Sequence, residues 1–181
     1  MQDNEGSKMS DRDFTARQAD ELLRRERWPV VRTQLPDICE EVGRFCLGSY
    51  TYSLHYLGQR VGWSQAIDPL HRCHDLATSI GNFFRLCGED MSPRLSSEQM
   101  EAHFEMVCGI VSLIHHMAIE PLVRFIRSEG SVQSEVFDGY GEFKRRWNDL
   151  IQRIEGLGRT SGLQVRLSMY VAPELGVQLK S

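Results

Sequence analysis

The chain has 181 residues, of which 41% are hydrophobic and 25% are charged, and its formal net charge at pH 7 is −4. These values are typical of one globular domain with its own core, and the negative balance argues against a general binder of polyanions such as nucleic acid. No apolar run approaches the ~20 residues that a membrane-spanning helix requires, so the sequence predicts no membrane span.

The sequence predicts three parts: a disordered N-terminus over residues 1–10, a helical bundle over residues 11–160 and a strand-like tail over residues 161–181. The first residues show neither the apolar centre of a secretion signal nor the acid-poor character of a transit peptide. The five cysteines form no C-x-x-C pair and fall on apolar helix faces or at their edges, which is typical of buried thiols in a reducing compartment. We therefore expect a cytoplasmic protein.

The first part of the bundle reads as a short surface helix that ends at Trp28 and Pro29. The residues from Val30 to Leu35 are then expected to form a loop or a short extended piece. Pro36 and the residue after it are a plausible start for a second helix, which runs to about Leu57. A third helix follows over roughly residues 65–86.

The segment from Ser96 to Arg127 is predicted to be one long helix at the centre of the fold. Its apolar arc is so wide that it must pack on more than one side. Ser96 can cap its first free N–H groups, and Pro121 predicts a kink near its end. The helix is expected to finish at Gly130.

The last predicted helix runs from about Val132 to Glu155, with a bend near Tyr140 where two glycines weaken it. In the tail, apolar and polar residues then alternate over nine positions, which predicts a strand that pairs with residues 30–35, with a second copy or with another protein. The apolar members of this alternation are Leu163, Val165, Leu167, Met169 and Val171. The fold class is therefore an all-α bundle of four main helices plus an N-terminal helix, with a short extended C-terminal tail.

The sequence contains none of the common catalytic motifs, and we name no catalytic residue. Whether the protein is an enzyme stays uncertain, and the sequence favours one that is not. We expect no cofactor. The alternative is a metal or haem held in the bundle interior by His74, His103 or His115. No pair of Glu-x-x-His units accompanies them, so we favour a buried or half-buried His103 that hydrogen-bonds a neighbour.

We interpret the chain as a non-enzymatic cytoplasmic protein–protein interaction module, a small helical subunit or regulator of a larger assembly. Its partner is another protein or a second copy, and besides the tail we expect apolar residues outside the main stripes to dock it. These residues are Ile119, Val123, Ile126 and Phe137. A second alternative is a nucleic-acid-associated subunit that uses the basic clusters at residues 24–27 and 144–146.

Overall fold

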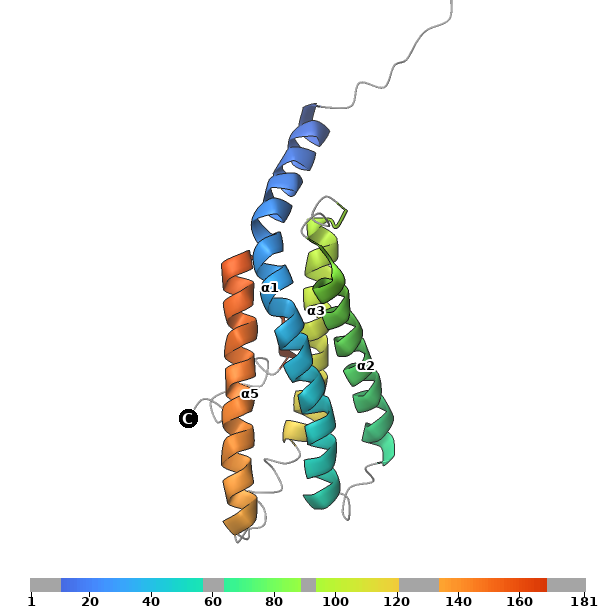
Figure 1. Ribbon diagram of the computed structural model, residues 1–181, viewed down its shortest axis with the longest axis vertical. Helices are drawn as coiled ribbons and strands as arrows, with labels where there is room; N and C mark the ends of the chain where they lie inside the picture. The colour runs from blue at the N-terminus through green and yellow to red at the C-terminus, as the bar shows by residue number, and fades with distance from the viewer. Residues whose placement is uncertain (1–10, 57–63, 89–93, 121–133, 169–181) are drawn as a thin grey trace, which may run out of the picture.

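The computed structural model describes residues 11–56, 64–88, 94–120 and 134–168. Within these ranges the chain is helical and contains no strand, which confirms the predicted all-α bundle (Figure 1). The elements are α1 (Asp11–Tyr56), α2 (Ser64–Leu86), α3 (Ser97–Ile114), the π-helical turn η2 (His115–Ile119) and α5 (Ser134–Ser161).

Several predictions concern parts of the chain outside the described residues. They are the disordered first ten residues, the kink at Pro121, the helix end at Gly130 and the docking residues Val123, Ile126, Met169 and Val171. Phe137 belongs to α5, but its side chain is outside the description as well.

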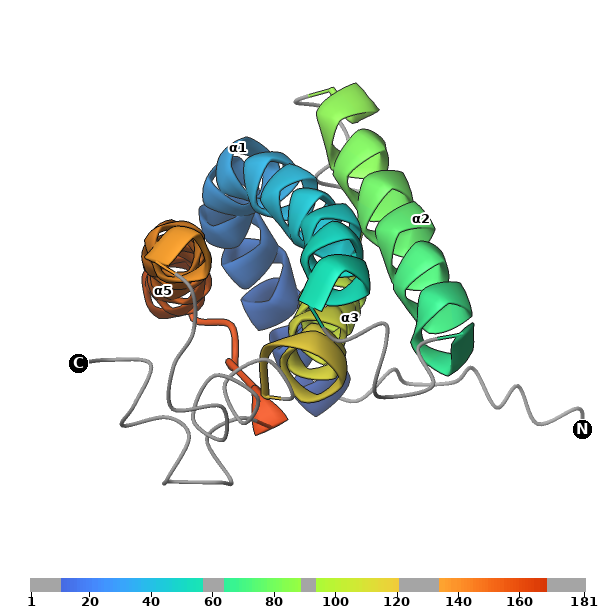
Figure 2. The ribbon, with the colours of Figure 1, turned by 90° about the horizontal axis from the view of Figure 1, so that it is seen from below.

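Helix α1 is one continuous helix of 46 residues, so the predicted break at Pro29 and the predicted loop up to Leu35 are wrong. An interior proline costs a helix about 3 kcal/mol. In α1, however, Trp28, Leu35 and two neighbours on the same face are at most 4% exposed, and burying a large apolar side chain contributes about 1.5–3 kcal/mol each. Burial therefore outweighs the prolines, and the helix bends instead of ending (Figure 2).

Helix α1 also takes the central position that the sequence assigned to the segment from Ser96. It lies between α5 and α2, and α3 packs against α1 and α2. Helix α1 therefore contacts every other described helix (Figure 2). The N-terminal end of α1 also projects past the other helices (Figure 1).

Helix α3 begins as predicted. The Ser96 hydroxyl accepts a hydrogen bond from the Gln99 backbone N–H at 3.1 Å, and the Gln99 side chain accepts one from the Ser96 N–H at 2.8 Å, forming a capping box. Among the described helices, the stretch Ser97–Ile119 is long and apolar enough to cross a membrane by length and composition alone, contrary to expectation. Its most apolar window is 56% buried within the bundle, and a core helix has the same composition.

The π-helical turn η2 corrects the prediction that Ile119 faces solvent, because its side chain is only 1% exposed. The prediction assumed a turn of 100° per residue throughout. In η2 the Glu120 N–H bonds to the carbonyl of His115, five residues earlier, so the turn holds one residue more than an α-helical turn. The following residues therefore lie on a different side of the helix from the one that a regular α-helix would give them.

Helix α5 continues to Ser161, beyond the predicted end at Glu155, and the chain then folds back on it. Gly162 has a φ of 66°, a left-handed conformation that favours glycine, and the Leu163 N–H bonds to the Gly158 carbonyl at 2.9 Å. The described tail residues form no strand. Leu163 and Leu167 are instead 5% and 4% exposed against the bundle. Alternation fits an extended segment on a helical core as well as it fits a strand, because alternate side chains share a face in both.

Candidate functional site

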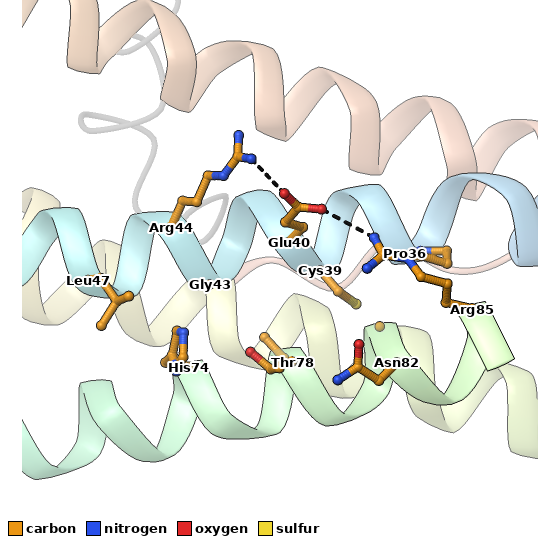
Figure 3. A pocket seen from close by; sticks show the side chains of 12 residues that line it. Pro36, Cys39, Glu40, Gly43, Arg44, Leu47, His74, Thr78, Asn82 and Arg85 are labelled. Carbon is orange, nitrogen blue, oxygen red and sulfur yellow. Dashed lines mark hydrogen bonds and ion pairs between the residues drawn. The ribbon is translucent and has the colours of Figure 1, made fainter.

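A groove of about 190 Å³ lies between α1 and α2, beside the middle of their contact (Figure 3). Two glycines shape it. A Cβ on Gly81 would lie 2.9 Å from the Cys39 Cβ, so this glycine permits the close approach of the helices. A Cβ on Gly43 would lie 3.4 Å from the His74 ring, so its absence leaves the groove open on that side. The remaining lining residues are Pro36, Glu40, Arg44, Leu47, Ala77, Thr78, Asn82 and Arg85.

An alternating chain of charges borders this α1–α2 groove. Glu40 binds Arg44 at 2.5 Å through one carboxylate oxygen and Arg85 at 3.2 Å through the other. Arg44 also lies 3.5 Å from Glu41, which binds Arg146 of α5 at 2.7 Å. Three arginines thus share two carboxylates, so this border of the groove carries one excess positive charge.

The α2 side of the groove is a polar ridge. His74, Thr78 and Asn82 recur every four residues and point toward α1 (Figure 3). The His74 Nδ1 donates to the neighbouring Asp75 carboxylate at 3.2 Å. The ridge supplies a hydroxyl, an amide and an imidazole, and hydrogen bonding to a ligand is the chemistry that they offer.

The cysteine at the groove floor is not an activated nucleophile. Burial raises the pKa of the Cys39 thiol to about 12, so it stays protonated near neutrality. Burial also raises the pKa of the other four thiols, and all five cysteines are free. The expectation of buried thiols is confirmed for four of them, whereas Cys73 is half-buried.

His115 lies deep in the bundle, 1% exposed, and its ring stacks on Trp147 of α5 at a centroid distance of 6.4 Å. Among the described residues, neither ring nitrogen of His115 has a hydrogen-bond partner, nor does the indole nitrogen of Trp147. Burial, and secondarily the neighbouring His116, lowers the pKa of His115 to about 4. The imidazole is therefore neutral near neutrality.

The other two proposed metal ligands lie apart from His115. The His103 Nδ1 donates to the Gln99 carbonyl at 2.6 Å and its ring stacks on Phe83 at 5.4 Å, which confirms the favoured interpretation of a half-buried, hydrogen-bonded histidine. His74 lines the α1–α2 groove. In the part of the chain that the structure describes, no three ligating side chains gather as a metal site would need.

The predicted tail contacts are made within the chain itself. The Ser168 N–H donates to the Ser112 hydroxyl at 3.0 Å, and the Ser168 hydroxyl lies 3.0 Å from His116 Nε2. Arg166 binds Glu105 at 2.8 Å. Leu163, Leu167 and the partly buried Val165 pack on the core, so these three predicted docking residues are covered by their own bundle.

A different apolar surface is left uncovered, and the sequence reasoning missed it. Leu76 and Phe83 of α2 are 41% and 36% exposed, and Met106 of α3 is 39% exposed. We call these three residues the α2–α3 face. The available signal was a second apolar row on α2, because Leu76 and Phe83 are seven residues apart and so share a side of the helix.

Most arginines of the two basic clusters pair with neighbouring carboxylates, and Arg27 donates to a backbone carbonyl. Four of their arginines have partners at hydrogen-bonding distance: Arg24 with Asp20 (3.3 Å), Arg25 with Glu21 (2.6 Å), Arg27 with the Gly162 carbonyl (3.3 Å) and Arg146 with Glu41 (2.7 Å). Arg145 binds Glu142. Such pairs are typical of a solvated helix surface.

No known protein family, curated protein or solved structure matches this chain.

Proposed function

We propose that this chain is a non-enzymatic protein–protein interaction module, a small helical subunit or regulator that works in the cytoplasm. Its partner is another protein or a second copy of itself. The observation that supports this proposal is the exposure of three large apolar side chains on the α2–α3 face.

The three side chains belong to one surface because α2 and α3 run antiparallel as neighbours (Figure 1). Phe83 contacts His103 across the two helices, with the rings nearly parallel at 8°. Met106 lies one turn further along α3, and Leu76 lies two turns back along α2, which is the same direction. The three apolar groups therefore lie on the exposed side of two neighbouring helices, and we expect the apolar face of a partner helix to pack on them.

Site-directed photo-crosslinking tests the proposal directly. Phe83 is replaced by the photoreactive residue p-benzoylphenylalanine, which resembles phenylalanine, in cells that naturally make the protein. We expect one discrete crosslinked product, whose mass distinguishes a second copy from another protein. The matched control carries the same residue at Leu22, which is 61% exposed on α1 and does not belong to the α2–α3 face. Equal products from both positions, or none from position 83, would contradict the proposal.

A second measurement uses charged substitutions. The double variant Leu76→Lys, Met106→Lys, which leaves position 83 free for the photoreactive residue, should lose the crosslinked partner or the oligomeric state seen by light scattering, while its helical content by circular dichroism stays unchanged. The control variant Leu22→Lys should keep both, because it places the same charge on an exposed apolar position elsewhere.

The two alternative functions remain predictions with simple tests. Stoichiometric metal or a haem absorption band in protein purified without a histidine tag would favour the sensor that uses His74, His103 or His115. Binding to nucleic acid that weakens steeply with salt would favour the nucleic-acid-associated subunit.

A further inference from the structure

The α1–α2 groove has the size of a site for a small organic molecule. Its volume is about 190 Å³. An apolar cavity of about 150 Å³ holds one benzene molecule, whereas sites for drug-sized ligands begin near ~300 Å³. The space therefore suits a ligand with a single ring or a short chain. Cys39 and Ala77 at the floor, both at most 1% exposed, and Leu47 at one end supply apolar contacts.

The charged side chains at the rim of the groove favour an anionic ligand. Glu40 is already shared between Arg44 and Arg85, so the carboxylate at the rim is saturated by cations. Arg85 meets Glu40 through one nitrogen only, and its side chain remains 53% exposed. A guanidinium has five N–H donors, so one contact leaves donors for a second oxyanion.

The polar ridge adds neutral donors beside that charge. Asn82 lies one turn before Arg85 on α2, and Thr78 lies one turn before Asn82; both side chains point into the groove (Figure 3). An amide N–H₂ and a hydroxyl can both donate to an oxyanion. The donors thus line one edge of the groove, while the apolar atoms form its floor.

We propose that the α1–α2 groove binds a small carboxylate whose body is one ring or a short apolar chain. The carboxylate lies against Arg85 and Asn82, and the apolar body lies over Cys39 toward Leu47. This site is separate from the α2–α3 face, so it holds or fails independently of the interaction function proposed above.

The test is a titration of the full-length, isotope-labelled protein with benzoate, followed by NMR. We expect saturable shifts of the Asn82 side-chain N–H₂ and the Arg85 Nε–H signals. Benzyl alcohol, which keeps the ring without the charge, should bind at least about ten-fold more weakly, because a hydrogen bond to a charged group contributes roughly 1.5–3 kcal/mol. Inorganic phosphate, which lacks the apolar body, should also bind more weakly than benzoate.

Two variants probe the two halves of the site. Arg85→Gln should weaken benzoate binding about ten-fold, whereas Arg72→Gln, an exposed arginine on α2 outside the groove, should leave it unchanged. Thr78→Leu should block binding by filling the groove, and Ser79→Leu, the neighbouring exposed position, should not. Shifts that stay linear with benzoate concentration, or an affinity for benzoate that is unchanged in Arg85→Gln, would overturn the proposal. Phosphate binding as tight as that of benzoate would overturn the apolar part of it.

Discussion

Helix α1 makes two different kinds of contact on its two sides. Toward α5 it packs through large rings: Phe45 meets Trp147 edge to face at 5.1 Å and Phe143 at 5.4 Å. Toward the middle of α2 it packs through the small residues Gly81 and Cys39, so closely that a Cβ on Gly81 would lie 2.9 Å from the Cys39 Cβ. The ring contact fills its space, whereas the small-residue contact leaves a groove along its flank. The described groove therefore lies on the α2 side of α1, and the edge-to-face ring contacts of Phe45 lie on the α5 side.

The largest expected effect lies on the ring side. Trp147→Ala should destabilise the fold by about 3–5 kcal/mol, because its side chain is fully buried and the bundle cannot close the cavity that remains. Urea unfolding followed by circular dichroism measures this change. The control Arg145→Ala, an exposed position on the same helix, should change stability by less than about 0.5 kcal/mol. A small effect at Trp147 would mean that the two sides do not differ as described.

The second effect concerns the histidine stacked on that tryptophan. Folded His115 has a pKa of about 4, and an unfolded histidine has a pKa of about 6.5. Between these values the unfolded chain binds a proton that the folded chain does not, so stability should fall as the pH falls through this window. The loss should approach about 3 kcal/mol, since one pKa unit corresponds to about 1.4 kcal/mol.

Urea unfolding at pH 7 and pH 4.5 measures this loss, and His115→Leu serves as the comparison. The variant removes the titrating group with little change in volume, so its stability should depend less on pH over this range. An identical pH dependence in both proteins would assign the loss to other groups.

The third effect tests the small-residue side. Gly81→Ala adds a Cβ 2.9 Å from the Cys39 Cβ and 3.5 Å from the Pro36 carbonyl oxygen, so the helices must separate. We expect a loss of about 1–3 kcal/mol. Thermal unfolding measures it, and unchanged stability would show that the helices can move apart freely there.

The smallest effect has the opposite sign. Gly109 of α3 is exposed, and an added Cβ would meet nothing within 4 Å. Gly109→Ala should therefore stabilise the protein by up to about 1 kcal/mol, because alanine favours helix and constrains the unfolded chain. The same thermal unfolding measurement applies. Together with Gly81→Ala it separates a glycine required by packing from one that packing does not require.

The sequence predicts the helix pattern better than the contacts between helices. The regular apolar spacing located α5, and the capping residue Ser96 located the start of α3. The continuation of the helix through Pro29 was missed because the effect of a proline is inferred from its sequence neighbours alone. The burial that outweighs this effect depends on the packing of α2, α3 and α5. Ile119 was misplaced because a π-helical turn leaves no mark in an apolar spacing measured at 100° per residue.

The candidate site could be predicted only in part. A glycine inside a helix, such as Gly43, favours a close helix crossing or a bend, and the helix that carries it does pack closely on α2. The bridging role of Glu40 could not be predicted, since it depends on which turn of α2 faces it. The α2–α3 face was hidden because Phe83 adjoins the buried Phe84, whose ring contacts Trp28 of α1, and sequence spacing alone does not separate the two.

The central position of α1 also has a consequence for the order of folding. Helices α1 and α2 are close in sequence, so they can pair early at little entropic cost, whereas the contact between Phe45 and Trp147 joins segments about a hundred residues apart. Docking of α5 should therefore follow the rate-limiting step. If so, Trp147→Ala accelerates unfolding far more than it slows refolding in stopped-flow experiments, while Gly81→Ala slows refolding.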